Sequence, residues 1–306
     1  MSIPRRHHYV PRVHIRRFKT ENGYHLFSKD KKEFINIKSS AHFFVIRDLN
    51  STIDFETGEV NHIQTEKELA QAWDSKFNEH CYRIMKYISF SLEEKAEYPE
   101  LIKDSLAFFF DYGVIGALRS IKRDKELNEN AFDWIDVLDE MKAVAETERF
   151  ADKIKMDKND FEQGFSHWKN VMGQAKEYAS KLKTLKFPFP TTTNADIFKP
   201  SSCSCDIILA PGSSFILPDR TAVLKPSHET FKYHSMTMNK ISCVGIPLTP
   251  KIFLQIKNND VCEDQSTTIY ALTPKRVAEF NLKLYNKARN QILCSDKNAL
   301  TTLIEN

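Results

Sequence analysis

Hydrophobic and polar positions follow three successive patterns along the chain. Residues 1–61 contain short segments in which apolar and polar residues alternate, whereas residues 62–186 carry apolar residues at intervals of three and four. Residues 191–306 return to short runs rich in β-branched residues, separated by Pro or Gly. A period of two is typical of strands, and a period near 3.6 is typical of helices. The chain therefore predicts N-terminal strands, a helical middle and C-terminal strands.

The N-terminal region predicts a β-hairpin. Residues 24–28 and 33–37 alternate on either side of the polar segment 29–32, as the two strands of a hairpin do. Residues 42–46 form a further apolar run, which we interpret as a third strand. Thr57-Gly58 marks another turn before the pattern changes.

The middle region begins with an amphipathic helix and continues with a buried one. The first helix has one apolar face, formed by Leu69, Trp73, Phe77, Cys81 and Ile84. Residues 101–119 are apolar on nearly every side, which predicts a central buried helix. Gly113 and Gly116 lower helix propensity there, so close packing against a neighbour is expected. Asp111 is expected at the surface of the same helix.

Two more helices are predicted at residues 131–150 and 157–186, both with highly charged outer faces. After them, short strands are expected at residues 205–210, 214–217, 241–246 and 252–256. A closing helix begins at Thr273, a good N-cap, with Pro274 in its first turn. Its apolar stripe is predicted to contain Val277, Phe280, Leu284, Ala288 and Ile292.

Strands at both ends of the chain around a helical middle indicate an α+β protein. We expect a mixed or antiparallel sheet built from the N- and C-terminal segments, with the helices as a large insertion. On this interpretation residues 1–306 form a single domain. Its parts are N-terminal strands (1–61), the helical middle (62–186) and the C-terminal strands with their closing helix (191–306).

The composition is that of a globular protein, with 41% hydrophobic and 28% charged residues. No apolar run reaches the roughly 18 residues of a membrane helix, and no apolar segment of a secretory signal follows the basic N-terminus. The 6 cysteines are scattered and include no CxxC pair, so reduced thiols are expected. We therefore expect a soluble cytoplasmic protein without a membrane partner.

The most unusual chemistry lies near the N-terminus, although the net charge of the whole chain is only +3. Residues 5–19 contain six Lys or Arg, three His and no acidic residue. We predict a short helix over residues 11–18, started by Pro11 and held to the core by Ile15 and Phe18. Arg12 and Arg16 then share an exposed face, with Arg17 beside them. Such a cluster is expected to bind an anion or phosphate, although a merely solvated basic arm is the alternative.

His7 and His8 precede this helix. Adjacent side chains on a regular backbone point in different directions, so both cannot ligate one ion. One imidazole could act as a general base or acid. Asp219, at the end of a predicted strand, is the second catalytic candidate. It could orient a His, bind a divalent cation such as Mg²⁺, or form a turn.

Three hypotheses follow for function. The first is a His-dependent phosphodiester hydrolase, a nuclease in a phage-defence or toxin role, with His7, His8 and Asp219 as catalytic residues. The second is a non-catalytic module that binds nucleic acid, a nucleotide or an acidic partner. The third is a purely structural role for His7 and His8. The sequence favours the first narrowly, and it contains no Gly-rich phosphate loop, HExxH or GxSxG motif.

The segment His7-His8-Tyr9-Val10-Pro11, followed by Ile15-x-x-Phe18, resembles the opening of the bacterial domain-of-unknown-function family numbered 4238. Further resemblances occur in the family's order: 47–49, 66–69, 215–219, 247–250 and Asn281. They span nearly the whole chain and imply a single fold, but no activity. The sequence departs from the family where Arg220-Thr221 replaces Asn-Pro. Residues 111–120 also lack the Gln and the Arg-Thr-Pro triplet of the family's middle helix.

Overall fold

The computed structural model describes residues 6–47, 51–53, 60–94, 99–121, 200, 202–233, 236–261 and 266–305. These residues belong to two compact units. The larger unit contains the described residues of 8–45, 68–120 and 190–306. The smaller unit contains those of 1–7 and 46–67, together with Ile121. The predicted turn at Thr57-Gly58 and the predicted helices 131–150 and 157–186 lie outside the described residues.

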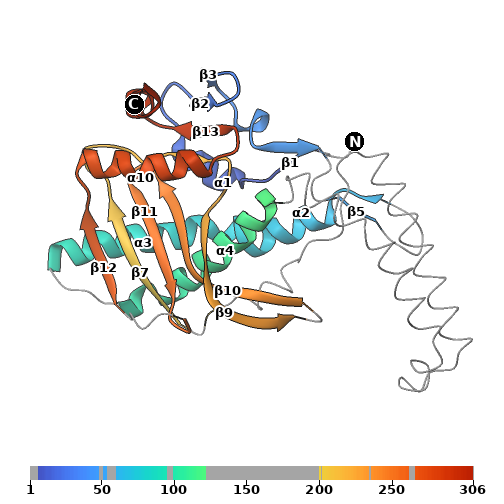
Figure 1. Ribbon diagram of the computed structural model, residues 1–306, viewed down its shortest axis with the longest axis vertical. Helices are drawn as coiled ribbons and strands as arrows, with labels where there is room; N and C mark the ends of the chain where they lie inside the picture. The colour runs from blue at the N-terminus through green and yellow to red at the C-terminus, as the bar shows by residue number, and fades with distance from the viewer. Residues whose placement is uncertain are drawn as a thin grey trace, which may run out of the picture. The chain divides into compact units, whose positions relative to one another are not determined.

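A five-stranded sheet from the C-terminal third of the chain organises the larger unit (Figure 1). In spatial order its strands are β12 (Thr267–Ala271), β7 (Cys203–Leu209), β11 (Ile252–Asn258), β10 (Met236–Thr249) and β9 (Val223–Tyr233). β12 runs parallel to β7, and the other neighbours are antiparallel, so the sheet is mixed. The predicted strands 241–246 and 252–256 are confirmed within β10 and β11, and the predicted strand 205–210 is confirmed in β7 except for Ala210. β9 and β12 were not predicted.

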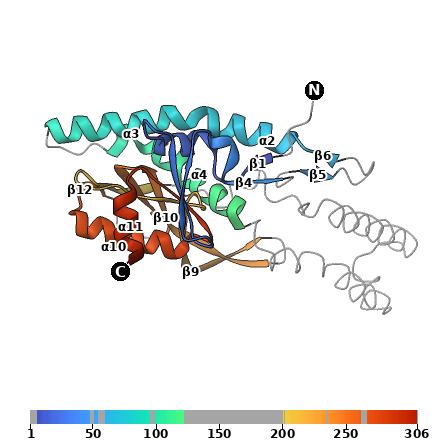
Figure 2. The same ribbon diagram turned by 90° about the horizontal axis from the view of Figure 1, so that it is seen from above.

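Helices cover both faces of this sheet (Figure 2). On one face lie α3 (Ser75–Glu94) and α4 (Lys103–Ile121), and on the other lies α10 (Pro274–Lys287). Each face of the sheet has its own hydrophobic core, and neighbouring strand residues alternate between them. Ile207 packs on the side of α3 and α4, and Ile208 packs on the side of α10. This alternation follows from the two-residue period of a strand. The chain reaches α3 through α2 (Gln64–Leu69) and a π-helical segment η3 (Ala70–Asp74), and η4 (Pro99–Leu101) precedes α4.

The glycines of α4 lie against β10 and the segment before β9. A Cβ at Gly113 would be 2.3 Å from Cγ1 of Val244, and one at Gly116 would be 2.4 Å from Cβ of Thr221. The predicted close packing is therefore confirmed. Asp111 was expected at the helix surface, and that prediction is wrong because the residue is buried. Residues 108–117 of the helix are all buried, so its polar position is enclosed with the apolar ones.

We expect Gly113→Ala to destabilise the protein by about 1–2 kcal/mol. Alanine improves helix propensity by about 1 kcal/mol, but overpacking a core typically costs about 1–3 kcal/mol. The stiff β-branched side chain of Val244 would have to move. Urea unfolding measures the change. Gly212→Ala is the matched control, because its Cβ would approach only Pro274, at 3.3 Å from Cγ and 3.9 Å from Cδ. Equal stability of the two variants would contradict the close packing.

A second sheet joins the two ends of the chain, as predicted. Its strand order is β3 (Glu33–Ile37), β2 (Tyr24–Ser28), β13 (Gln291–Cys294) and β8 (Leu217–Pro218). The predicted hairpin is confirmed with both strands at their expected residues. Of the predicted strand 214–217 only Leu217 lies in a strand, because β8 consists of Leu217 and Pro218. The fold is therefore α+β, with N- and C-terminal strands in one sheet and a helical segment between them.

Two elements have bounds in the structure that differ from the predicted ones. Of the predicted strand 42–46 only Val45 and Ile46 lie in a strand, because η2 (Ser40–His42) includes His42 and Phe44 adopts a left-handed φ of 54°. β4 (Val45–Arg47) begins only after this kink. The closing helix begins as predicted, with the Thr273 side chain accepting a hydrogen bond from the Arg276 N–H. It ends at Lys287, so Ile292 belongs to β13 and not to the helix. A final helix, α11 (Lys297–Glu305), was not predicted.

The smaller unit is described only in part. β5 (Thr52–Ile53) and β6 (Val60–Asn61) pair antiparallel, and the side chains of Ser51 and His62 are hydrogen-bonded at 2.7 Å. Within the described part of the chain, no helix is both long enough and apolar enough to cross a membrane.

Candidate anion-binding site

We call residues 7–11 the HHYVP box. It begins in a strand and ends at the N-cap of a helix. β1 (Arg6–His8) pairs with β4, and Tyr9 and Val10 are then buried. The helix begins at α1 (Arg12–Ile15) and continues as the 3₁₀ turn η1 (Arg16–Phe18). Pro11 occupies the N-cap and not the first helical position, and its carbonyl accepts from the N–H groups of His14 and Ile15. Ile15 and Phe18 are both fully buried, as predicted.

His7 and His8 face different surroundings. They are neighbours in the strand β1, where successive side chains point to opposite faces, and His7 is buried while His8 is half-buried. His8 Nε2 donates to the Ser40 carbonyl oxygen at 2.9 Å, and its own carbonyl accepts from Nη2 of Arg119 at 2.5 Å. Arg119 is buried in the last turn of α4. Arg119 lies 111 residues from His8 in the sequence, so no local pattern predicts this contact.

Asp219 accepts three backbone hydrogen bonds. Oδ1 accepts from the N–H of Arg289 at 2.8 Å, and Oδ2 accepts from Asn290 and Gln291 at 2.9 and 3.0 Å. The side chain is 2% exposed. A carboxylate in this position supplies acceptors for the backbone between α10 and β13, where the chain leaves the helix. Asp219 therefore has a structural role in the fold, whatever else it does.

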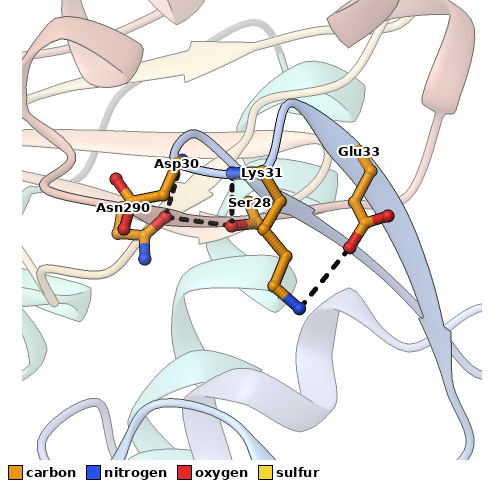
Figure 3. Close-up of polar contacts among 5 residues, drawn as sticks. All are labelled: Ser28, Asp30, Lys31, Glu33 and Asn290. Carbon is orange, nitrogen blue, oxygen red and sulfur yellow. Dashed lines mark hydrogen bonds and ion pairs between the residues drawn. The ribbon is translucent and has the colours of Figure 1, made fainter.

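The segment 289–291 also connects to the N-terminal hairpin. Oδ1 of Asn290 accepts from the Ser28 hydroxyl at 3.1 Å and from the Asp30 N–H at 3.2 Å (Figure 3). At the same turn, the Lys31 N–H donates to the Ser28 hydroxyl oxygen, and its ammonium lies 3.7 Å from Glu33 (Figure 3). This turn of the hairpin is thus fixed to the residues that Asp219 holds.

Gln291 extends the same connection to the HHYVP box. Its Oε1 accepts from the Tyr9 hydroxyl and from the Phe44 N–H, both at 3.3 Å. The Phe44 carbonyl in turn accepts from the Tyr9 N–H at 3.0 Å. We call Asp219, Asn290 and Gln291 the junction. It links the HHYVP box, the hairpin and the C-terminal strand β13 through side-chain and backbone hydrogen bonds.

The guanidinium groups of α1 and η1 lie outside this junction. Arg12 and Arg16 are exposed, as predicted for residues four apart. Within the described residues neither side chain has a hydrogen-bond or carboxylate partner. Arg17 is half-buried and donates to Oδ1 of Asn78 on α3 at 2.6 Å. The nearest acidic residue in the sequence is Glu21, so the segment 5–19 itself supplies no carboxylate to neutralise this charge.

His14 is the residue that sequence reasoning missed. It is fully buried among the rings of Phe18, Phe77 and Tyr112, and Nε2 donates to the Pro247 carbonyl at 2.7 Å. Burial lowers its pKa to about 4, assisted by the charge of Arg17 and opposed by the hydrogen bond to Pro247. His14 is therefore neutral at physiological pH. His14 is adjacent to Ile15 and four residues before Phe18. This spacing places it on the buried face of the helix and could have predicted its burial.

The cysteines of β7 behave as core residues. Cys205 is buried, and burial raises the pKa of its thiol well above the usual range. Burial, followed by the carboxylates of Asp111 and Asp260, raises the pKa of Cys203 to about 12. Both thiols are protonated at neutral pH. Among the described residues, no group of three or more His, Cys, Asp or Glu is placed to hold a metal ion.

These observations define a class: an α+β protein in which a buried HHYVP box carries an exposed basic helix. The family model described as "Protein of unknown function (DUF4238)" matches residues 6–298. The chain therefore belongs to this family, as its HHYVP box predicted. No curated protein and no solved structure matches the chain.

Proposed function

We propose that the protein binds the phosphate backbone of a nucleic acid through Arg12, Arg16 and Arg17. The observation that carries this proposal is the pair of exposed guanidinium groups of Arg12 and Arg16, which have no carboxylate partner in the described part of the chain. Guanidinium groups bind phosphate oxygens in a bidentate manner, and phosphate contacts provide most of the affinity for nucleic acids. The buried residues of the HHYVP box hold the helix that carries these cations.

Hydrolysis of the bound phosphodiester by His7 or His8 with Asp219 is the alternative proposal. Acid–base catalysis would require these groups to reach the phosphate. Asp219 already accepts from three backbone N–H groups, and a turnover step would have to retain or replace these bonds. For this reason the geometry favours binding over catalysis.

Charge reversal tests the proposed site. We expect Arg12→Glu/Arg16→Glu to weaken binding of a labelled oligonucleotide at least tenfold, because each lost phosphate contact removes counterion release and each new carboxylate repels the backbone. Fluorescence anisotropy at constant salt measures the affinity. The melting temperature should hardly change, since surface substitutions away from packed features alter stability by about 0.5 kcal/mol or less.

Lys275→Glu/Lys287→Glu is the matched control. Both lysines are exposed on α10, on the opposite face of the five-stranded sheet from α3, and the double variant changes the net charge equally. Equal loss of affinity in the two double variants would mean that only net charge matters, which contradicts the proposed site. Cleavage of the oligonucleotide that disappears in a folded His8→Ala variant would favour the hydrolase.

A further inference from the structure

We propose that the nucleic acid recognised here is single-stranded, with a base stacking on Tyr82 of α3. This inference rests on the proposed function, because the stacked base belongs to the strand whose phosphates Arg12, Arg16 and Arg17 hold. It adds the class of nucleic acid and the residue that selects it.

The basic helix is fastened to α3 beside Tyr82. Arg17 donates to Asn78 at 2.6 Å, and the ring of His14 lies 5.3 Å from that of Phe77. Residues four apart on a helix lie one above the other on the same face. Tyr82 is therefore the next side chain along α3 from Asn78. A strand that ran from Arg17 along α3 would reach this ring one turn beyond Asn78.

Tyr82 presents its ring to solvent. It is 65% exposed, whereas α3 buries Phe77, Cys81 and Ile84 on its other face. Its hydroxyl has no partner in the described part of the chain. Two more apolar side chains continue the exposed face beyond Tyr82, namely Met85 (43% exposed) and Leu92 (58% exposed). A large ring left uncovered next to unneutralised cations is the arrangement found in proteins that bind single strands.

The charges along this face favour a polyanion near Tyr82. Lys86 is exposed one turn beyond Tyr82, so cations stand on both sides of the ring. Glu79 is already paired with Arg83 at 2.6 Å. In a duplex the faces of the bases are covered by the neighbouring bases, whereas in a single strand each base can stack on an aromatic ring. An exposed tyrosine therefore adds affinity for a single strand but not for a duplex.

Binding of an oligothymidylate of about 12 nucleotides, within the usual site size, tests this inference with the full chain. We expect Tyr82→Ala to weaken binding about tenfold, Tyr82→Phe to preserve it, and a hairpin duplex to bind wild type and Tyr82→Ala equally. Tyr270→Ala is the matched control, since Tyr270 is 42% exposed on β12 and should leave the affinity unchanged. Circular dichroism melting verifies that each variant is folded.

Two results would overturn the stacking role. If Tyr82→Ala binds the oligothymidylate as wild type does, the ring takes no part, although binding that depends on Arg12 and Arg16 would still support the proposed function. If Tyr82→Leu binds the oligothymidylate like wild type while Tyr82→Ala does not, the side chain acts through apolar contact alone and not by ring stacking. Binding by neither wild type nor any variant would overturn the inference and the proposed function together.

Discussion

Replacing Asp219 with alanine should destabilise the protein by about 4 kcal/mol, because three backbone N–H groups lose their acceptor together. Each buried donor left unsatisfied costs about 1–3 kcal/mol, and the exposed neighbour Arg289 allows water to reach part of the site. A loss of this size lowers the melting temperature by roughly 6 °C in a chain of this length. Asp219→Asn should cost about half as much, since its amide oxygen still accepts while its NH₂ group opposes a donor.

Urea unfolding and hydrogen exchange measure this effect. The N–H groups of Phe44 and Lys29, which are bonded to the side chain of Gln291 and the carbonyl of Asn290, should exchange faster in Asp219→Ala. Asp206→Ala is the matched control. Its carboxylate accepts from the Thr268 hydroxyl at 2.9 Å and lies 3.4 Å from Lys257, so its removal should cost about 1 kcal/mol or less. An unchanged melting curve in Asp219→Ala, with loss of a cleavage activity, would contradict the structural role.

Acidification should lower the free energy of unfolding by about 3 kcal/mol through His14 alone. Burial holds the pKa of His14 at about 4, below the 6.5 of an exposed imidazole. Between these values the unfolded chain binds a proton that the folded chain does not bind, so stability falls as the pH falls from about 6.5 to 4. Above 6.5 the contribution is fully present, and below 4 it is lost. Each pKa unit corresponds to about 1.4 kcal/mol.

The structural reason for this penalty is the second ring nitrogen. Nε2 of His14 donates to Pro247, and Nδ1 is buried with no partner among the described residues. A proton added to Nδ1 would find no acceptor. The charge would also lie among aromatic rings, away from water.

His14→Phe should flatten the pH dependence. The variant should be less stable than wild type at pH 7, because the Pro247 carbonyl loses its donor, but its stability should fall less between pH 6.5 and 4. Burial also lowers the pKa of His80, so the comparison is the difference between variant and wild type. Equilibrium unfolding in urea at several pH values gives both slopes. Equal slopes would show that His14 does not titrate as its burial requires.

Local patterns predicted those elements whose causes are local. The hairpin was predicted at its observed residues because alternation and a polar turn are adjacent in the sequence. The start of α10 was predicted because Thr273 caps it directly. Gly113 and Gly116 indicated a close contact because glycine has no side chain, so a neighbouring element can approach the helix at these positions. These predictions required no knowledge of distant residues.

The remaining elements depend on distant partners. Ile292 continues the helical spacing of Val277, Phe280, Leu284 and Ala288, so the sequence offered no reason to end the helix at Lys287. The chain leaves the helix where Asp219, some 70 residues earlier, accepts from the N–H groups of residues 289–291. β9 was missed because residues 225–229 are polar and the strand is defined by its pairing with β10.

The candidate site likewise combines features that local patterns predict with features that depend on distant residues. The basic face of Arg12 and Arg16 follows from four-residue spacing and was predicted. The surroundings of His14, the contact of Arg119 with His8 and the bonds of Asp219 all join segments far apart in the chain. Short motifs could locate these residues but could not separate a catalytic carboxylate from one that stabilises the backbone.

The dependence of oligonucleotide affinity on salt tests the central claim most directly. Each phosphate contact to a single strand contributes about 0.7 to the slope of log affinity against log salt. We predict that Arg12→Ala/Arg16→Ala reduces the magnitude of this slope by roughly 1.4 relative to wild type, with an unchanged melting curve. An unchanged slope in the folded double variant would show that these guanidinium groups do not contact phosphate, and would contradict the account.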